Sequence, residues 1–148
     1  MRLIAAALIA SLLPACGGAS PYDPVQRADA TKPSPVLGET FTLRSQESAT
    51  LQGEGLTLLF SRVVNDSRCP AGVQCIWEGN AEVEVSASKP PEPSQMLSLN
   101  TNSRFATQAS YLGYRIDLIE LRPCPDTDHA GGAADQCIGL KVIKPERE

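Results

Sequence analysis

The chain has 148 residues, and 13 lysines and arginines stand against 17 aspartates and glutamates, so its formal net charge at pH 7 is −4. This length suits one domain around one hydrophobic core. An acidic chain without a cluster of basic residues has no electrostatic reason to bind nucleic acid, which attracts basic surfaces. We therefore expect a single domain and no nucleic-acid partner.

The N-terminus has the layout of an export signal. Arg2 precedes an apolar run from Leu3 to Leu13, which is too short to cross a bilayer as a helix, since crossing takes about 20 residues. The run ends in Leu13-Pro14-Ala15-Cys16, which resembles the lipobox of bacterial lipoproteins. The resemblance implies a signal peptide over residues 1–15 and a palmitate-type lipid anchor on Cys16. An ordinary signal peptide is the alternative.

The segment after the lipidation site predicts how the domain is held in the envelope. Gly17, rather than an aspartate, follows Cys16, which in Gram-negative lipoproteins usually permits transport to the outer membrane. Residues 16–36 are rich in Gly, Ser, Pro, Ala and Asp and lack periodicity, which is typical of a flexible tether. We expect a membrane-anchored domain over residues 37–145, facing the periplasm of a Gram-negative host, and a tail over residues 146–148.

Between tether and tail, short segments alternate apolar and polar residues, as half-buried strands do. The predicted strands cover residues 39–45, 56–64, 81–88, 96–101, 111–121 and 138–144. The clearest alternation is in residues 81–88, where Glu82 and Glu84 should face solvent. Turns are expected at Gly53 to Gly55, at Gly79-Asn80 and at Lys89 to Pro93, and a helical turn near Ser103 to Ser110.

This pattern favours an all-β fold over any α/β arrangement. Six or seven short strands without an apolar stripe of helical period indicate a single small antiparallel sandwich or barrel. The fold predicts that the apolar residues of the clearest strand form part of the core. These are Ala81, Val83, Val85 and Ala87.

The cysteines beyond Cys16 are even in number, which in an exported domain predicts disulfides. They are Cys69, Cys75, Cys124 and Cys137. We favour the pairs Cys69–Cys75 and Cys124–Cys137, because each closes a polar, turn-rich loop between predicted strands. The alternative joins the two loops across one end of the sheet. Neither spacing is that of a zinc knuckle or a redox CxxC, so we expect no metal and no thiol chemistry.

The stretch DSRCPAGVQCIWEGNAEV, residues 66–83, resembles a pattern found in small bacterial exported proteins and lipoproteins, DSRCP-x-x-V-x-C-x-W-x-G-x-A. The resemblance implies export and carries no activity, so no catalytic residue is transferred from it. Within the stretch we expect the disulfide to fasten a turn, after which Ile76 and Trp77 lead the chain back toward the core.

Four residues are candidates for contact with a ligand or partner. Asp66 and Arg68 could form a recognition pair, although a turn-capping role is the simpler interpretation. Trp77 is either a stacking platform or packing that covers the disulfide. His129 lies in an acidic loop with nearby aspartates, and these could collect a cation or simply be solvated. The aspartates of this loop are Asp126, Asp128 and Asp135.

No catalytic motif is recognisable. Any Ser-His-Asp arrangement would have to use His129, the single histidine, and GxSxG, GxGxxG, P-loop and HExxH motifs are absent. We therefore expect a protein that is not an enzyme and needs no cofactor, whose disulfide-stapled loops bind an envelope protein or a small ligand. The alternatives are a protease-inhibitor-like module that offers the Cys69–Cys75 loop to an active site, and an enzyme based on carboxylates.

Overall fold

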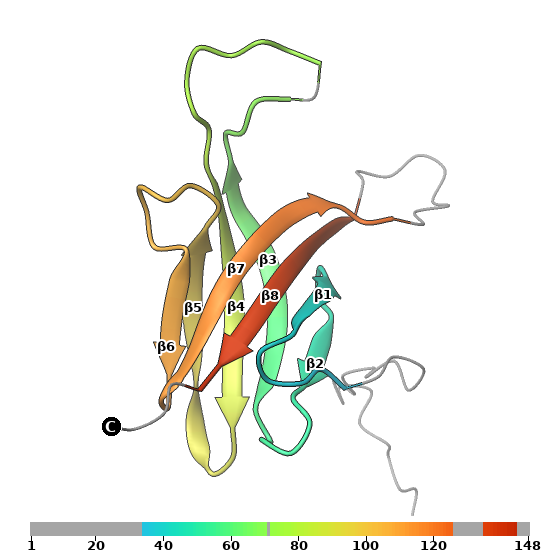
Figure 1. Cartoon of the computed structure of the whole chain (residues 1–148), viewed down its shortest axis with the longest axis vertical. Coiled ribbons are helices and arrows are strands. Elements are labelled where there is room, and N and C mark those ends of the chain that lie inside the picture. Colours follow the sequence, from blue (N-terminus) through green and yellow to red (C-terminus); the bar gives the residue numbers. More distant parts are fainter. Residues whose placement is uncertain (1–33, 71, 126–134, 145–148) are drawn as a thin grey trace, which may run out of the picture.

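The computed structural model describes residues 34–70, 72–125 and 135–144. The predicted signal peptide, Cys16, most of the tether, His129 with Asp126 and Asp128, and the tail lie outside the described residues. Within them the chain forms eight strands (Figure 1). They are β1 (Thr40–Arg44), β2 (Ser48–Thr50), β3 (Thr57–Asp66), β4 (Ala81–Lys89), β5 (Glu92–Asn100), β6 (Gln108–Tyr111), β7 (Tyr114–Pro123) and β8 (Gln136–Ile143).

The strands form two four-stranded antiparallel sheets, in the orders β1-β8-β7-β6 and β2-β3-β4-β5. The two sheets lie face to face (Figure 1), and their facing side chains form one hydrophobic cluster. The all-β, antiparallel prediction is therefore confirmed, and the architecture is a sandwich rather than a barrel. No helix long and apolar enough to span a bilayer occurs in the described parts of the chain.

Strand β4 shows how the sequence pattern builds the core. Its four alternating apolar residues, Ala81, Val83, Val85 and Ala87, are all 0% exposed, as predicted. Glu82 and Glu84 lie on the other side of the strand and are only partly buried. Glu84 forms an ion pair of 2.8 Å with Arg62 on the neighbouring strand β3. The alternation of side chains across a strand thus separates the core from the charged face.

The facing sheet supplies the other half of the core from β7 and β8. Alternate residues of these strands point inward and are buried. The burial of each large apolar side chain stabilises the folded state by about 1.5–3 kcal/mol. The buried residues are Tyr114, Ile116, Leu118, Ile138, Leu140 and Val142. Leu58 and Phe60 of β3 meet them from the opposite sheet.

The predicted strand over residues 111–121 is in fact two strands. The chain reverses at Leu112 and Gly113, whose φ angles are +48° and +80°, and Tyr111 pairs directly with Tyr114 across this two-residue turn. An apolar alternation does not reveal the reversal, because Leu112 stands where such turns usually have Asn, Asp or Gly.

Two other predictions about local structure are corrected. The helical turn expected near Ser103 to Ser110 is wrong, since residues 108–111 form strand β6 and only a turn, closed by a hydrogen bond from Phe105 N to Asn102 O (3.0 Å), precedes it. The turn predicted at Lys89 to Pro93 is shorter than expected. Lys89 already pairs with Glu92 in the ladder, which leaves Pro90 and Pro91 as the turn, with a cis bond between them.

Both favoured disulfide pairings are confirmed. Cys124 and Cys137 are buried and join the end of β7 to the beginning of β8. Cys69 and Cys75 lie in the long connection between β3 and β4, outside either sheet. One disulfide therefore fixes two strands inside the sandwich, whereas the other fixes a loop.

Candidate functional site

The connection between β3 and β4, residues 67–80, extends beyond the ends of both sheets, at the top of Figure 1. We call it the stapled loop, because the Cys69–Cys75 disulfide closes a small ring within it. Most of the stretch from residue 66 to residue 83, which the sequence singles out, lies in this loop or at its two ends. The geometry of the loop therefore shows how these residues are arranged.

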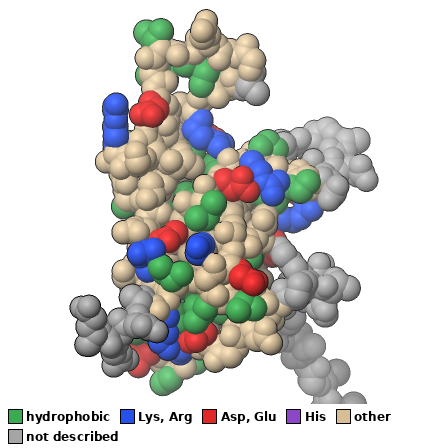
Figure 2. All heavy atoms as spheres, viewed as in Figure 1, with side chains coloured by type: hydrophobic (Ala, Val, Ile, Leu, Met, Phe, Trp, Pro, Cys, Tyr) green, Lys and Arg blue, Asp and Glu red, His purple; other side chains and the backbone are tan. Residues whose placement is uncertain are grey.

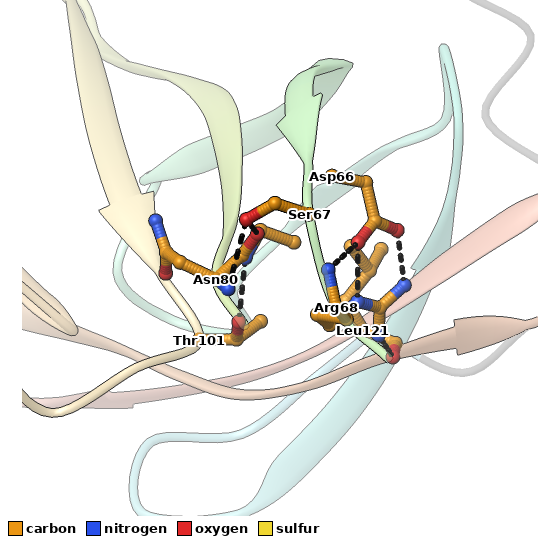
Figure 3. A network of polar contacts seen from close by, with 7 residues as sticks. Asp66, Ser67, Arg68, Asn80, Thr101 and Leu121 are labelled. Carbon is orange, nitrogen blue, oxygen red and sulfur yellow. Dashed lines mark hydrogen bonds and ion pairs between the residues drawn. The ribbon is translucent and has the colours of Figure 1, made fainter. Parts of the chain in front are cut away.

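Hydrogen bonds hold the two arms of the stapled loop together at its base, which we call the neck. Ser67 N donates to Asn80 O at 2.8 Å, immediately beyond the last ladder pair of β3 and β4. The Ser67 hydroxyl donates to the same carbonyl at 2.9 Å and accepts from Asn80 N at 3.2 Å (Figure 3). Ala81 N, one residue further on, donates to Thr101 Oγ1 at 2.8 Å. The arms therefore cannot separate without breaking several hydrogen bonds.

Gly79 allows the arms to approach this closely. A Cβ atom at this position would lie 2.4 Å from Arg68 Cα and 2.4 Å from Ser67 O, distances that backbone atoms cannot tolerate. Glycine is the residue that permits a close approach of two backbones. The close approach of the arms at the neck therefore requires a glycine at position 79.

Asp66 and Arg68 fix the neck to the opposite sheet. Arg68 Nη2 and Nε meet the two carboxylate oxygens of Asp66 at 2.5 and 2.8 Å, and Arg68 Nη1 donates to the carbonyl of Leu121 on β7 (Figure 3). The hydrogen bonds from Arg68 lower the pKa of Asp66, and the hydrogen bonds to Asp66 raise the pKa of Arg68. Asp66 Oδ1 also accepts from Arg68 N at 3.1 Å, which is the turn-capping role.

A second brace comes from the segment after β5. Asn102 is buried, and its side chain donates to Gly79 O at 3.2 Å and accepts from Arg104 N at 2.9 Å. Asn80 bridges to the last residue of β5 and to this segment, since its side chain donates to Asn100 Oδ1 at 2.8 Å and accepts from Asn102 N at 3.1 Å. Buried polar groups satisfied in this way hold a single geometry. Sequence reasoning missed these asparagines.

Beyond the neck, the loop exposes apolar side chains. Ile76 is 96% exposed and Trp77 is 64% exposed, and Val73 is also exposed. Figure 2 shows hydrophobic side chains on the projecting loop at the top of the view. The prediction that Ile76 and Trp77 lead the chain back to the core is therefore wrong, because the loop extends past the end of both sheets and no facing strand covers it. We call these three residues the tip.

The three tip residues are uncharged, and the charged residue next to them is already paired. Glu78 pairs with Arg104 at 3.7 Å, and both side chains are exposed. Among the described residues, no group of three or more His, Cys, Asp or Glu side chains is arranged to hold a metal ion. The predicted contact residues fall into three cases: Asp66 and Arg68 hold the neck, Trp77 is presented to solvent, and His129 lies outside the described residues.

A scan against protein-family models, a search of curated proteins and a search of solved structures each found no match to this chain. The functional argument therefore depends on the geometry of the stapled loop. Sequence reasoning identified Trp77 but missed Val73 and Ile76. Their signal was present, since both are large apolar residues in a segment that is otherwise rich in turn-forming and polar residues.

Proposed function

We propose that the protein is a non-catalytic binding domain of the cell envelope and that the tip of the stapled loop contacts another protein. The observation that carries the proposal is the exposure of Ile76 and Trp77 on a loop whose base is fixed. Exposed apolar side chains contribute nothing to folding at this position. Tryptophan, in contrast, is enriched among the residues that dominate binding energies at protein interfaces.

The bracing of the loop supports the same function. Binding costs free energy whenever a flexible loop has to become ordered. The Cys69–Cys75 disulfide, the neck and the Arg68 contact to β7 order the base of the loop before any partner arrives. A loop presented in this way by a rigid β scaffold is a common recognition surface.

The expected lipid anchor on Cys16 fits an outward-facing tip. The described chain begins in the lower half of Figure 1, whereas the stapled loop lies at the top. The tether would therefore join the sandwich at the end away from the loop, which leaves the tip accessible to a partner. In a Gram-negative host we place the protein at the outer membrane with its tip in the periplasm.

The test is photo-crosslinking in the bacterium that makes the protein. A photo-reactive amino acid at Val73 should give a discrete covalent adduct with a partner protein, whereas the same probe at Met96, exposed on β5, should give none. Adding Ile76→Ser and Trp77→Ser should lower the adduct yield by about tenfold or more, because truncating a residue that is buried at the centre of an interface weakens binding by at least about that much.

Folding is the control for this test. Ile76→Ser with Trp77→Ser should leave the free energy of unfolding within about 0.5 kcal/mol of the parent, because exposed residues contribute little. Met96→Ser, which removes a similarly exposed apolar side chain elsewhere, should leave the adduct yield unchanged. An adduct that persists without Ile76 and Trp77, or that forms equally from position 96, would contradict the proposal.

A protease-inhibitor-like module is the second candidate, favoured by one observation. A small disulfide ring presents Val73 and Cys75 on a projecting, braced loop, which is a shape that an active-site cleft could accept. This function predicts that a target protease is inhibited at stoichiometric concentration while the oxidised loop stays intact. Rapid cleavage between Cys69 and Cys75 by every protease tested would reject it.

A further inference from the structure

A pocket lies at the end of the sandwich away from the stapled loop. Strand β4 runs from the neck at Ala81 to Lys89, and Lys89 lines this pocket of about 350 Å³. The pocket lies between the β4–β5 turn, the β6–β7 turn and the end of β8. It is also lined by Pro90, Pro91, Glu92, Leu112, Tyr114 and Lys144.

Two lysines converge on one tyrosine in this pocket. Lys89 Nζ lies 4.9 Å and Lys144 Nζ lies 5.2 Å from the centroid of the Tyr114 ring, distances at which an ammonium group interacts favourably with an aromatic face. Tyr114 is buried, so its position is set by the core. Lys89 Nζ also donates to the Tyr114 hydroxyl at 2.6 Å, and this hydrogen bond raises the pKa of Lys89.

The carboxylate that balances these lysines is shared. Glu54 Oε2 lies 4.0 Å from Lys89 Nζ and 3.5 Å from Lys144 Nζ, and it also accepts a hydrogen bond from the Tyr114 hydroxyl. An ammonium group has three donors, so one shared carboxylate leaves donors of both lysines for another acceptor. Glu92 adds an exposed carboxylate to the lining. A bound anion would therefore gain from hydrogen bonds rather than from a net positive charge.

Leu112 is the residue that folding does not explain. It is 47% exposed and has a positive φ angle of 48°, in a two-residue turn that usually takes Asn, Asp or Gly. Neither burial nor backbone conformation favours a leucine there. A position that breaks a local rule is expected where the residue serves a function. Here Leu112 lines the pocket together with Pro90 and Pro91, and these residues give it apolar surface.

We propose that this pocket binds the carboxylate of a small apolar acid. The carboxylate oxygens accept hydrogen bonds from Lys89 and Lys144, and the apolar body of the ligand lies against Leu112 and the two prolines. The volume is at the lower end of the range for small-molecule sites. The ligand is either a free acid or the C-terminus of a polypeptide that ends in an apolar residue, since both present the same chemistry. This site does not depend on the function of the stapled loop.

The test uses protein-detected NMR on the full chain carrying Cys16→Ser, which keeps it free of lipid. Octanoate should shift the Leu112 methyl and Tyr114 ring resonances saturably, and octanol should bind about tenfold more weakly or not at all, because it lacks the charge that makes such hydrogen bonds strong. A pentapeptide ending in leucine, with a free or an amidated C-terminus, distinguishes the two sources. Saturable binding of octanoate or of the free-acid peptide supports the proposal.

Variants separate a binding site from a structural feature. Lys144→Gln should weaken octanoate binding by about tenfold, and Glu92→Gln should strengthen it by about threefold, because it removes a competing negative charge. Lys141→Gln, on β8 outside the pocket lining, should have no effect. Leu112→Asn should weaken binding while it stabilises the turn. Failure of octanoate and the free-acid peptide to bind saturably, or binding that Lys144→Gln and Leu112→Asn leave unchanged, would overturn the proposal.

Discussion

Strand β4 and the stapled loop are adjacent in the sequence, yet their apolar residues differ in burial. Every inward apolar residue of β4 is fully buried, whereas Ile76 and Trp77, a few residues earlier, are largely exposed. The difference arises at the neck. In β4, which follows the neck, the chain has a paired strand on each side and a second sheet facing it, and within the loop it has neither.

This comparison separates residues that stabilise the fold from residues available for binding. An apolar side chain is buried only if the backbone places it opposite another layer. Because the stapled loop leaves both sheets, its apolar residues stay in water, and their conformation is maintained by polar contacts at the base instead. We therefore expect substitutions in β4 to change stability, those at the neck to change both stability and loop geometry, and those at the tip to change binding alone.

The largest effect should come from a charge placed in the core. Val83→Asp buries an unpaired carboxylate at a fully buried position of β4 and should cost at least about 4 kcal/mol of unfolding free energy. Glu82→Lys, on the other face of the same strand, should change it by no more than about 0.5 kcal/mol. Urea unfolding of both variants measures the difference, and equal tolerance would mean that the register of β4 is misassigned.

A smaller but substantial effect should come from the neck. Gly79→Ala forces the two arms apart, because its Cβ would meet the backbone of Ser67 and Arg68, and it should cost about 3 kcal/mol, as overpacking does. Gly72→Ala in the same loop is the control. It meets no atom within 4 Å but has a φ of +82°, so only backbone strain of about 1 kcal/mol is expected. A reversed order in thermal unfolding would contradict the role of the neck.

The Cys69–Cys75 disulfide should matter less for stability than for local order. Replacing both cysteines with serine should lower the free energy of unfolding by about 2 kcal/mol or less, because the ring is small. Replacing Cys124 and Cys137 should cost about 3 kcal/mol from the longer ring alone, with the loss of buried sulfur in addition. Hydrogen exchange should accelerate within the stapled loop in the first variant and across β7 and β8 in the second.

The smallest effect concerns pH. Arg68 lowers the pKa of Asp66 below its ordinary value of 3.8 in the folded protein, so the stabilising contribution is present above pH 3.8 and is lost as the pH falls further. Asp66→Asn should therefore be less stable than the parent at pH 7, by no more than about 1 kcal/mol for so exposed a pair. The gap should close in acid. A gap that persists unchanged at pH 2 would exclude the ion pair as its cause.

Much of the fold follows from local patterns in the sequence. The alternation in β4 identified its buried face, and both disulfides could be inferred because each closes a nearby loop. Strand β2 has only three residues, too few to show a period. The reversal at Leu112 was hidden because an apolar residue occupies a turn position.

The candidate site was harder to predict than the fold. Composition identifies Ile76 and Trp77 as apolar, and an apolar residue is usually assigned to a core. Whether a second layer covers it depends on where the sheets end, which is a property of the tertiary structure. The same holds for the asparagine contacts of the neck, since Asn80 and Asn102 are brought together by two different loops. Sequence spacing does not encode such contacts.

The closed neck also has a consequence for how this protein can evolve. Because Ser67, Gly79 and Asn80 complete the hydrogen bonding at the base, the exposed tip residues lie outside the hydrophobic core of the sandwich. Their identities can drift, or be exchanged as a block, while the scaffold and its folding remain the same. The domain thus combines a constant β sandwich with a variable binding loop, so that a change of partner would require new tip residues rather than a new fold.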